Sequence, residues 1–152
     1  MPPIKSPSDD MLALENQFCF ALYSTSLAMT KTYKALLDRL GLTYPQYLVM
    51  LVLWEGDDVL VKSIGEKLLL DSGTLTPLLK RLEALGLVKR TRDRLDERQV
   101  RITLTRDGRA LKRRARDIPP QVLCASGRSQ KTLVELRAQL LAIRTDLIHH
   151  NT

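Results

Sequence analysis

The stretch GTLTPLLKRLEALGLVKR, residues 73–90, contains a predicted helix that is followed at once by the start of a strand. Leucines recur through it at helical spacing and predict a stripe that faces the core: Leu75, Leu78, Leu79, Leu82 and Leu85. Asp71 is a favourable N-cap before this helix, and Gly86 is a favourable terminator after it. The opposite face is expected to carry short polar and basic side chains: Ser72, Thr74, Thr76, Lys80 and Arg81.

The segments on either side of this helix have the patterns of a second helix and a hairpin. Val61–Leu70 carries apolar residues at helical spacing, which predicts a short helix joined tightly to the next. Leu87–Arg92 and Gln99–Thr105 alternate and are rich in Val, Ile and Thr, which predicts a β-hairpin with a charged connector. Two tightly joined helices followed directly by a basic hairpin make a winged helix-turn-helix.

The outward face of the helix and the hairpin have the chemistry of a DNA-binding surface. A recognition helix needs short Ser, Thr and Gly positions to approach the major groove closely, and Lys or Arg to hold phosphates or read guanine. From Lys89 to Asp117 the chain has twelve Lys or Arg and five Asp or Glu, which accounts for its whole net charge of +7. Such a block attracts a polyanion, although a merely solvated basic helix is the plain alternative. Arg94, near the expected hairpin tip, is the candidate for insertion into a narrow minor groove.

The rest of the chain predicts a mainly α-helical fold around this small β-hairpin wing. A long helix is expected from Met11 to about Leu40, and a second over Thr43–Trp54 that opens with a capping box between Thr43 and Gln46. A basic helix over Arg106–Arg116 is expected to end at Pro119-Pro120. Apolar residues over Leu133–Leu147 form a two-heptad seam suited to packing against a partner helix. The expected organisation is a disordered tail over residues 1–10 and a single domain over 11–152, with dimerisation helices in 11–42 and 106–152 and the winged helix-turn-helix in 43–105.

The composition of the chain limits the classes of protein to which it can belong. The chain has 152 residues, 44% of them hydrophobic and 27% charged, as in an ordinary one-domain protein. It has no apolar run of membrane-spanning length, and its start lacks the apolar core of a signal peptide, so we expect a cytosolic protein without a membrane partner. Two cysteines and two histidines do not form a zinc pattern, so we expect no metal and no cofactor.

Cys19 has an unusual neighbourhood, because it lies between Phe18 and Phe20 and has tyrosines four and fourteen residues further on. At about 100° per residue, Tyr23 and Tyr33 share its helical face. Tyr33 lies about 21 Å further along the same helix, so only a Tyr33 from a second subunit could touch Cys19. The plain alternative is that Cys19 is a small buried hydrophobe and that the tyrosines only pack.

Two stretches together resemble a known family. GTLTPLLKRLEALGLVKR and DERQVRITLTRDG, residues 96–108, resemble the MarR family of dimeric winged-helix regulators. LDSGTLTPLLKRLE, residues 70–83, is similar to the OhrR branch of organic-peroxide sensors. The resemblance implies a homodimer whose recognition helices enter successive major grooves of double-stranded operator DNA. It also implies that Asp96 and Arg98 match the wing motif and brace the hairpin.

The same resemblance implies roles for the residues around Cys19. Cys19 would be a peroxidatic cysteine whose thiolate is hydrogen-bonded by tyrosine hydroxyls of the facing subunit, with Tyr33 and Tyr44 at matching positions. Phe18 and Phe20 would make the pocket apolar, which suits organic hydroperoxides. The branch includes a type with a second cysteine near the C-terminal helices, which Cys124 matches. Oxidised Cys19 would then form a disulfide with Cys124 of the other subunit, and the protein would release its operator.

Three other functions compete with a redox-sensing repressor. A regulator released by a small phenolic or aromatic ligand would leave both cysteines passive. A thiol peroxidase would consume peroxide catalytically, but the sequence offers it no separate peroxidase domain, so we expect no enzyme. A constitutive architectural DNA-binding protein would respond to neither oxidant nor ligand.

Overall fold

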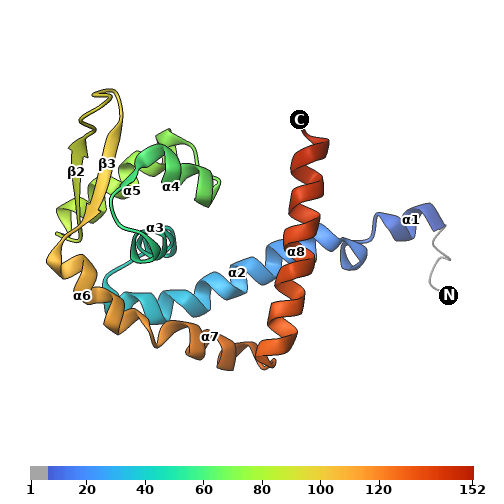
Figure 1. Cartoon of the computed structure of the whole chain (residues 1–152). Helices are drawn as coiled ribbons and strands as arrows, with labels where there is room; N and C mark the ends of the chain where they lie inside the picture. Colours follow the sequence, from blue (N-terminus) through green and yellow to red (C-terminus); the bar gives the residue numbers. More distant parts are fainter. Residues whose placement is uncertain (1–6) are drawn as a thin grey trace. The chain divides into compact units, whose positions relative to one another are not determined.

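The computed structural model describes residues 7–152, which form helices and one small sheet (Figure 1). The chain divides into two compact units, one that ends at Ala115 and one over Arg116–Thr152. The helices are Pro7–Met11 (α1), Phe18–Leu37 (α2), Tyr44–Glu55 (α3), Val61–Leu68 (α4), Ser72–Ala84 (α5), Arg106–Ala115 (α6), Ile118–Ser126 (α7) and Gln130–His150 (α8). The strands are Val59–Leu60 (β1), Val88–Arg92 (β2) and Val100–Leu104 (β3).

The long N-terminal helix begins later than its sequence predicts. A 3-10 turn over Leu14–Asn16 separates α1 from α2, and Gln17 is the extended N-cap of α2. The Gln17 amide donates to the carbonyl oxygen of Met11 at 2.7 Å, so local side-chain bonds replace helical ones here. Of the tail expected to be disordered, residues 1–6 lie outside the described part, and residues 7–10 belong to α1.

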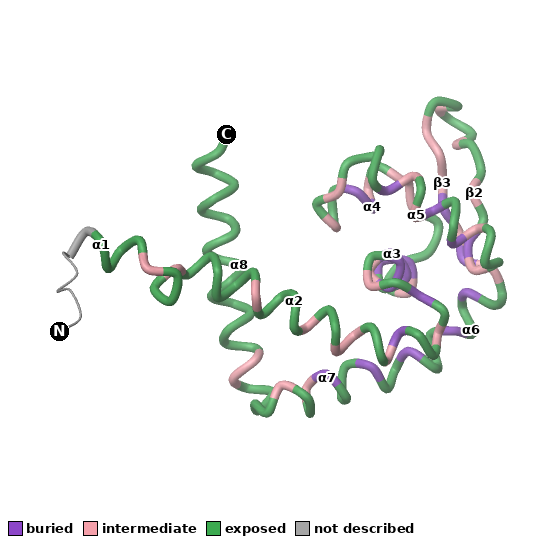
Figure 2. The backbone as a smooth tube through the Cα atoms, turned by 180° about the vertical axis from the view of Figure 1, so that it is seen from behind, coloured by how far each residue is buried: buried purple, intermediate pink, exposed green. Residues whose placement is uncertain are grey.

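The core of the first unit lies between α3, α4, α5 and the sheet, and α3 is its most buried helix (Figure 2). Helix α3 begins with the predicted capping box, in which Gln46 N donates to Thr43 Oγ1 and Thr43 N donates to Gln46 Oε1. The predicted leucine stripe of α5 is largely confirmed. Leu85 is the exception: α5 ends at Ala84, so Leu85 leaves the buried face and is 53% exposed.

The turn between α4 and α5 is closed by local hydrogen bonds. Leu69 adopts the left-handed conformation at φ 58° and ends α4. The predicted N-cap is confirmed, because the Asp71 carboxylate accepts from Thr74 N at 2.7 Å. Pro77 lies inside α5, where its ring crowds the carbonyl four residues earlier, and that position is Gly73. Gly86 ends the segment at φ 75°, as predicted.

The predicted hairpin is the larger part of a three-stranded antiparallel sheet of order β1-β3-β2. Strands β2 and β3 pair from Val88 opposite Leu104 to Arg92 opposite Val100. Strand β1, only two residues long, pairs with β3 and was not predicted. It adds the third strand just before α4, and so joins the wing to the helix-turn-helix.

The second unit contains a helix that the sequence pattern concealed. Pro119 and Pro120 were expected to end the basic helix, but they lie in the first turn of α7, where a missing backbone N–H disrupts no helical bond. Cys124 is therefore on a helix and is exposed. Ser129 is the N-cap of helix α8, and its side chain accepts from Thr132 N.

No helix in the described part of the chain has the length and apolarity needed to cross a membrane.

Candidate functional sites

The N-terminal turn of α5 presents the small polar residues of the predicted recognition surface. Ser72 and Thr74 are exposed and Thr76 is half-buried, while Lys80 and Arg81 are exposed two turns later. The backbone N–H of Thr74 binds the Asp71 carboxylate and lowers its pKa, so this cap stays charged at neutral pH. The first turn is thus held rigid, and its short side chains face solvent.

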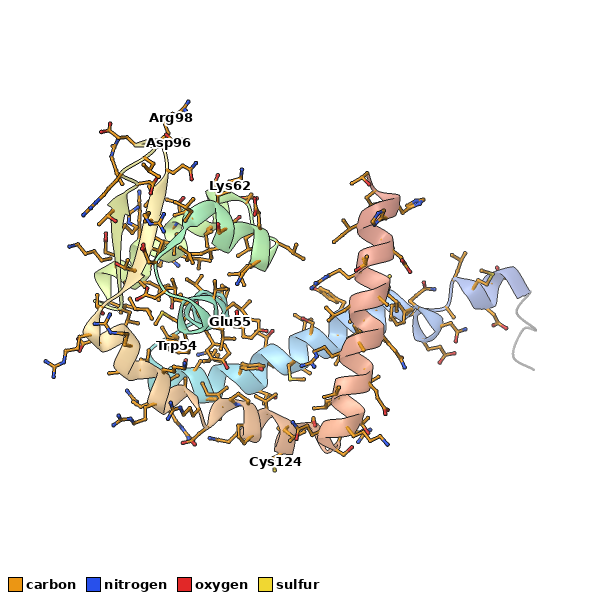
Figure 3. All side chains as sticks on the ribbon, viewed as in Figure 1. Trp54, Glu55, Lys62, Asp96, Arg98 and Cys124 are labelled. Carbon is orange, nitrogen blue, oxygen red and sulfur yellow. The ribbon has the colours of Figure 1, made fainter. Side chains whose placement is uncertain are left out.

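The wing tip carries cations and an exposed apolar residue. Arg94 is exposed, and the neighbouring Leu95 is 97% exposed. Asp96 accepts from the backbone N–H of Arg98 at 3.1 Å and from its Nε at 3.2 Å, and the backbone bond lowers the pKa of Asp96 (Figure 3). The Arg98 side chain is 92% exposed, so its ion pair is expected to add little stability and the carboxylate contributes chiefly by ordering the turn.

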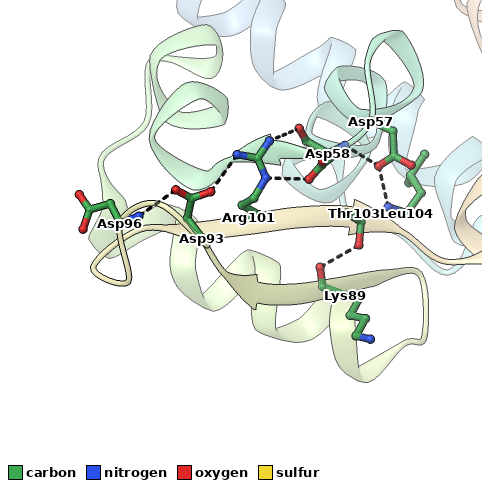
Figure 4. A network of polar contacts seen from close by, with 8 residues as sticks. All are labelled: Asp57, Asp58, Lys89, Asp93, Asp96, Arg101, Thr103 and Leu104. Carbon is green, nitrogen blue, oxygen red and sulfur yellow. Dashed lines mark hydrogen bonds and ion pairs between the residues drawn. The ribbon is translucent and has the colours of Figure 1, made fainter.

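Arg101 joins the base of the wing to the turn before β1, a role that the sequence did not reveal (Figure 4). Its Nε donates to Asp58 Oδ1 at 2.8 Å, and its other two nitrogens donate to Asp93 Oδ1 and to the Asp58 carbonyl oxygen. Asp57 accepts from Leu104 N at 2.8 Å beside it. Asp57 and Asp58 both lie in the turn between α3 and β1. They fix the orientation of the hairpin relative to α4.

Replacing Arg101 with methionine should lower the free energy of unfolding by about 1–2 kcal/mol, because it leaves the carboxylate of Asp93 without its cation. The Asp93 side chain is only 13% exposed, so the carboxylate that loses its cation is partly buried. Arg98→Met is the matched control in the same wing, and we expect it to change stability by less than about 0.5 kcal/mol. Urea denaturation at fixed protein concentration measures both, and equal effects of the two substitutions would contradict the bracing role of Arg101.

Three tyrosines form a ring cluster between α2 and α3. The ring centroids of Tyr33 and Tyr44 are 4.8 Å apart, and Tyr47 lies 5.9 Å from Tyr33. Burial, with smaller contributions from Tyr44 and Tyr47, raises the pKa of Tyr33 to about 12, so its hydroxyl remains a hydrogen-bond donor at neutral pH. Tyr47 was not singled out from the sequence, because its contact with Tyr33 joins two different helices.

A small apolar cavity adjoins this cluster. Its volume is about 190 Å³, and it is lined by Leu22, Thr25, Ser26, Met29, Thr30, Tyr33 and Tyr44. Because the lining residues of α2 recur at helical spacing, the cavity runs along one face of that helix. An aliphatic group of modest size fits its walls.

Cys19 is the second residue of α2 and is exposed, so it takes no part in the core of its own chain. Its sulfur lies in the first turn of the helix. Phe18, Phe20 and Tyr23 are also exposed, so the apolar side chains around the thiol have no cover within the described chain. Within one chain the helix places Tyr33 about 21 Å from Cys19, and the two are not brought together.

Comparison with known proteins identifies the family to which these features belong. Residues 31–115 match the family described as transcriptional regulator SarA/Rot. Over 142 residues the chain is 51% identical to the organic hydroperoxide resistance transcriptional regulator of Bacillus subtilis (strain 168), an alignment that covers 93% of this chain and 97% of that protein. The chain belongs to the MarR/SarA group of winged-helix transcriptional regulators.

Solved structures agree with this assignment. Reduced AbfR of Staphylococcus epidermidis bound to DNA matches with a TM-score of 0.78 at 36% identity, covering 95% of this chain and 99% of AbfR. Disulfide-formed AbfR matches with a TM-score of 0.61 at 39% identity, covering 90% and 96% of the two chains. The predicted fold class and the resemblance to the organic-hydroperoxide branch are confirmed. This chain therefore shares the winged helix-turn-helix fold of these regulators.

Proposed function

We propose that this protein is a homodimeric repressor that binds its operator when Cys19 is reduced and releases it after an organic hydroperoxide oxidises Cys19. The observation that carries the proposal is the exposed Cys19 thiol in the first turn of α2, beside Phe18 and Phe20, in a winged-helix regulator. A thiol so placed meets solutes readily, and its apolar surroundings favour peroxides that carry a hydrocarbon group.

Operator binding is assigned to α5 and the wing. Ser72, Thr74 and Thr76 would contact base edges, Lys80 and Arg81 would hold phosphates, and Arg94 would enter the minor groove. Two observations support this assignment. All of these side chains are exposed except Thr76, which is half-buried, and the Asp71 cap holds the first turn of α5 in place. Asp96 and Arg98 would keep the wing tip ordered for this contact.

A homodimer would complete both the operator site and the sensor. Helix α8 exposes an apolar stripe along its length, with Leu136, Leu140, Ile143 and Leu147 each at least 38% exposed. Such a stripe on a single chain is expected to be covered by a partner helix. In a dimer, Tyr33 and Tyr44 of the second subunit would reach the Cys19 sulfur and donate hydrogen bonds to its thiolate. Tyr23, one turn from Cys19 on the same face, would line that pocket.

The oxidation proceeds in two balanced steps. The Cys19 thiolate attacks one peroxide oxygen, the O–O bond breaks, and the leaving alkoxide takes a proton, which gives a sulfenic acid and an alcohol. The Cys124 thiolate of the second subunit then attacks the sulfenic sulfur, the S–O bond breaks as the disulfide forms, and the leaving hydroxide takes a proton to give water. Structures of AbfR, a relative, have been solved in a reduced, DNA-bound state and in a disulfide-formed state. They support this order of steps.

The test measures operator affinity by fluorescence anisotropy before and after stoichiometric cumene hydroperoxide. The duplex is selected from a random pool by the reduced protein. We expect a loss of affinity of about tenfold or more, because allosteric coupling typically spans roughly 5- to 150-fold. Non-reducing gels should show a disulfide-linked dimer that dithiothreitol reverses and that is absent from Cys124→Ser. Unchanged affinity in the oxidised wild type would sink the proposal and leave a ligand-released or constitutive DNA-binding protein.

A further inference from the structure

A second and larger cavity lies within the winged helix-turn-helix, apart from the tyrosine cluster. Its volume is about 750 Å³, within the roughly 300–1,000 Å³ of small-molecule sites. It is bounded by α4, α5 and the wing strands. Its walls are mainly aliphatic, with contributions from Leu60, Val61, Leu69, Leu70, Leu75 and Val100.

The wall of this cavity contains an exposed leucine in a costly conformation. Leu69 ends α4 at φ 58° and is 57% exposed. The left-handed region disfavours a residue with a branched side chain, and such positions cluster at ligand sites and switches. An alkyl chain in the cavity would cover Leu69. The aliphatic walls, with no aromatic ring among the described lining residues, suit such a chain better than a stacked ring.

The charged residues of the cavity are mostly cationic. Lys62, Arg90 and Arg98 contribute to its lining against one acid, Glu66. Arg90 is already paired with Glu83 at 3.3 Å, and Arg98 is paired with Asp96. Lys62, exposed at the start of α4, has no ion-pair partner within the described residues (Figure 3). An anionic head group beside Lys62 would complement this excess of positive charge.

We propose that the cavity binds the anion of a medium-chain fatty acid, with its alkyl chain among the aliphatic walls and its carboxylate beside Lys62. Ser72 and Thr76 of α5 and Arg98 of the wing also line the cavity. A bound alkyl chain therefore lies between the wing and α5, against the surface assigned to DNA. It lowers DNA affinity reversibly and without thiol chemistry. Only this effect on DNA rests on the proposed function.

Calorimetry on the reduced full-length protein, without DNA, tests the site itself. Titration with hexanoate, octanoate and decanoate should show one ligand per chain, with affinity rising about fourfold per added methylene. Decanol, which has no charge, should bind several-fold more weakly than decanoate. No saturable binding, or affinity independent of chain length, would overturn the proposal whatever the regulator does with peroxide.

Substitutions on α4 locate the head group. Lys62→Gln should weaken decanoate binding by about threefold and leave decanol binding unchanged, as expected for an exposed ion pair. Lys67→Gln is the matched control, because Lys67 is exposed on the same helix but pairs with Glu55 at 3.7 Å and does not line the cavity. Equal effects of the two substitutions on decanoate binding would contradict the assignment to Lys62.

The effect on DNA is measured by anisotropy with reduced Cys19→Ser, which removes the redox response. Saturating decanoate should weaken operator binding by about tenfold, and dilution of the ligand should restore it. Calorimetric binding with unchanged DNA affinity would overturn the regulatory step. An effect confined to protein that contains Cys19 would also overturn it, because it would assign the response to redox chemistry.

Discussion

Replacing Cys19 with serine is expected to leave operator binding by the reduced protein within about twofold of wild type and to abolish release by organic hydroperoxide. Cys19 is exposed and makes no disulfide, so an oxygen in place of its sulfur should disturb little packing. The serine hydroxyl stays protonated at neutral pH and does not attack a peroxide, because the thiolate is the nucleophile. Anisotropy titrations with selected duplex, before and after cumene hydroperoxide, measure both quantities.

Cys124→Ser separates the first oxidation step from the second. Mass spectrometry should find sulfenic or further oxidised Cys19 in this variant, and non-reducing gels should find no linked dimer. Release by oxidised Cys124→Ser would mean that the sulfenic acid alone lowers affinity and that the disulfide serves recovery. Release by Cys19→Ser at the wild-type dose would contradict the sensing role of Cys19.

The elements that short-range signals define were predictable from the sequence. The Thr43–Gln46 capping box, the Asp71 cap and the leucine period of α5 each involve residues a few positions apart. The two caps are confirmed, and so is the leucine period except at Leu85. Strand β1 was missed because it is two residues long and depends on β3, more than 40 residues away. Helix α7 was missed because a Pro-Pro pair is compatible with either the end or the first turn of a helix.

In the candidate sites, too, features set by neighbouring residues were predictable and contacts between distant residues were not. The position of Cys19 and the shared face of Tyr23 and Tyr33 follow from helical geometry alone. The contacts that organise the wing do not, because Arg101 reaches Asp58 across 43 positions of sequence. Alternation places Arg101 on one face of a strand, but it does not identify an acid elsewhere in the chain as its partner. The exposed Asp96–Arg98 pair was visible in sequence because its residues are neighbours.

Gly108 is buried where α6 leaves the wing. Its N–H donates to Thr105 Oγ1 at 3.0 Å, and its carbonyl oxygen accepts from Trp54 Nε1 at 2.9 Å. A Cβ at this position would clash with the backbone carbonyl oxygen of Leu87 and lie 3.2 Å from Leu104 Cδ2. A backbone atom cannot rotate away as a side chain can, so α6 would have to move from β2.

Replacing Gly108 with alanine should therefore lower the free energy of unfolding by about 3 kcal/mol, at the upper end of overpacking effects. Gly56→Ala is the control, because no atom lies within 4 Å of a Cβ there and its backbone is extended, so the expected change is within about 0.5 kcal/mol. The chain has one tryptophan, Trp54, whose fluorescence follows urea unfolding beside the altered residue. Protein concentration is held fixed because association would shift the midpoint. A stability for Gly108→Ala equal to that of Gly56→Ala would show that α6 can separate from the sheet at no cost.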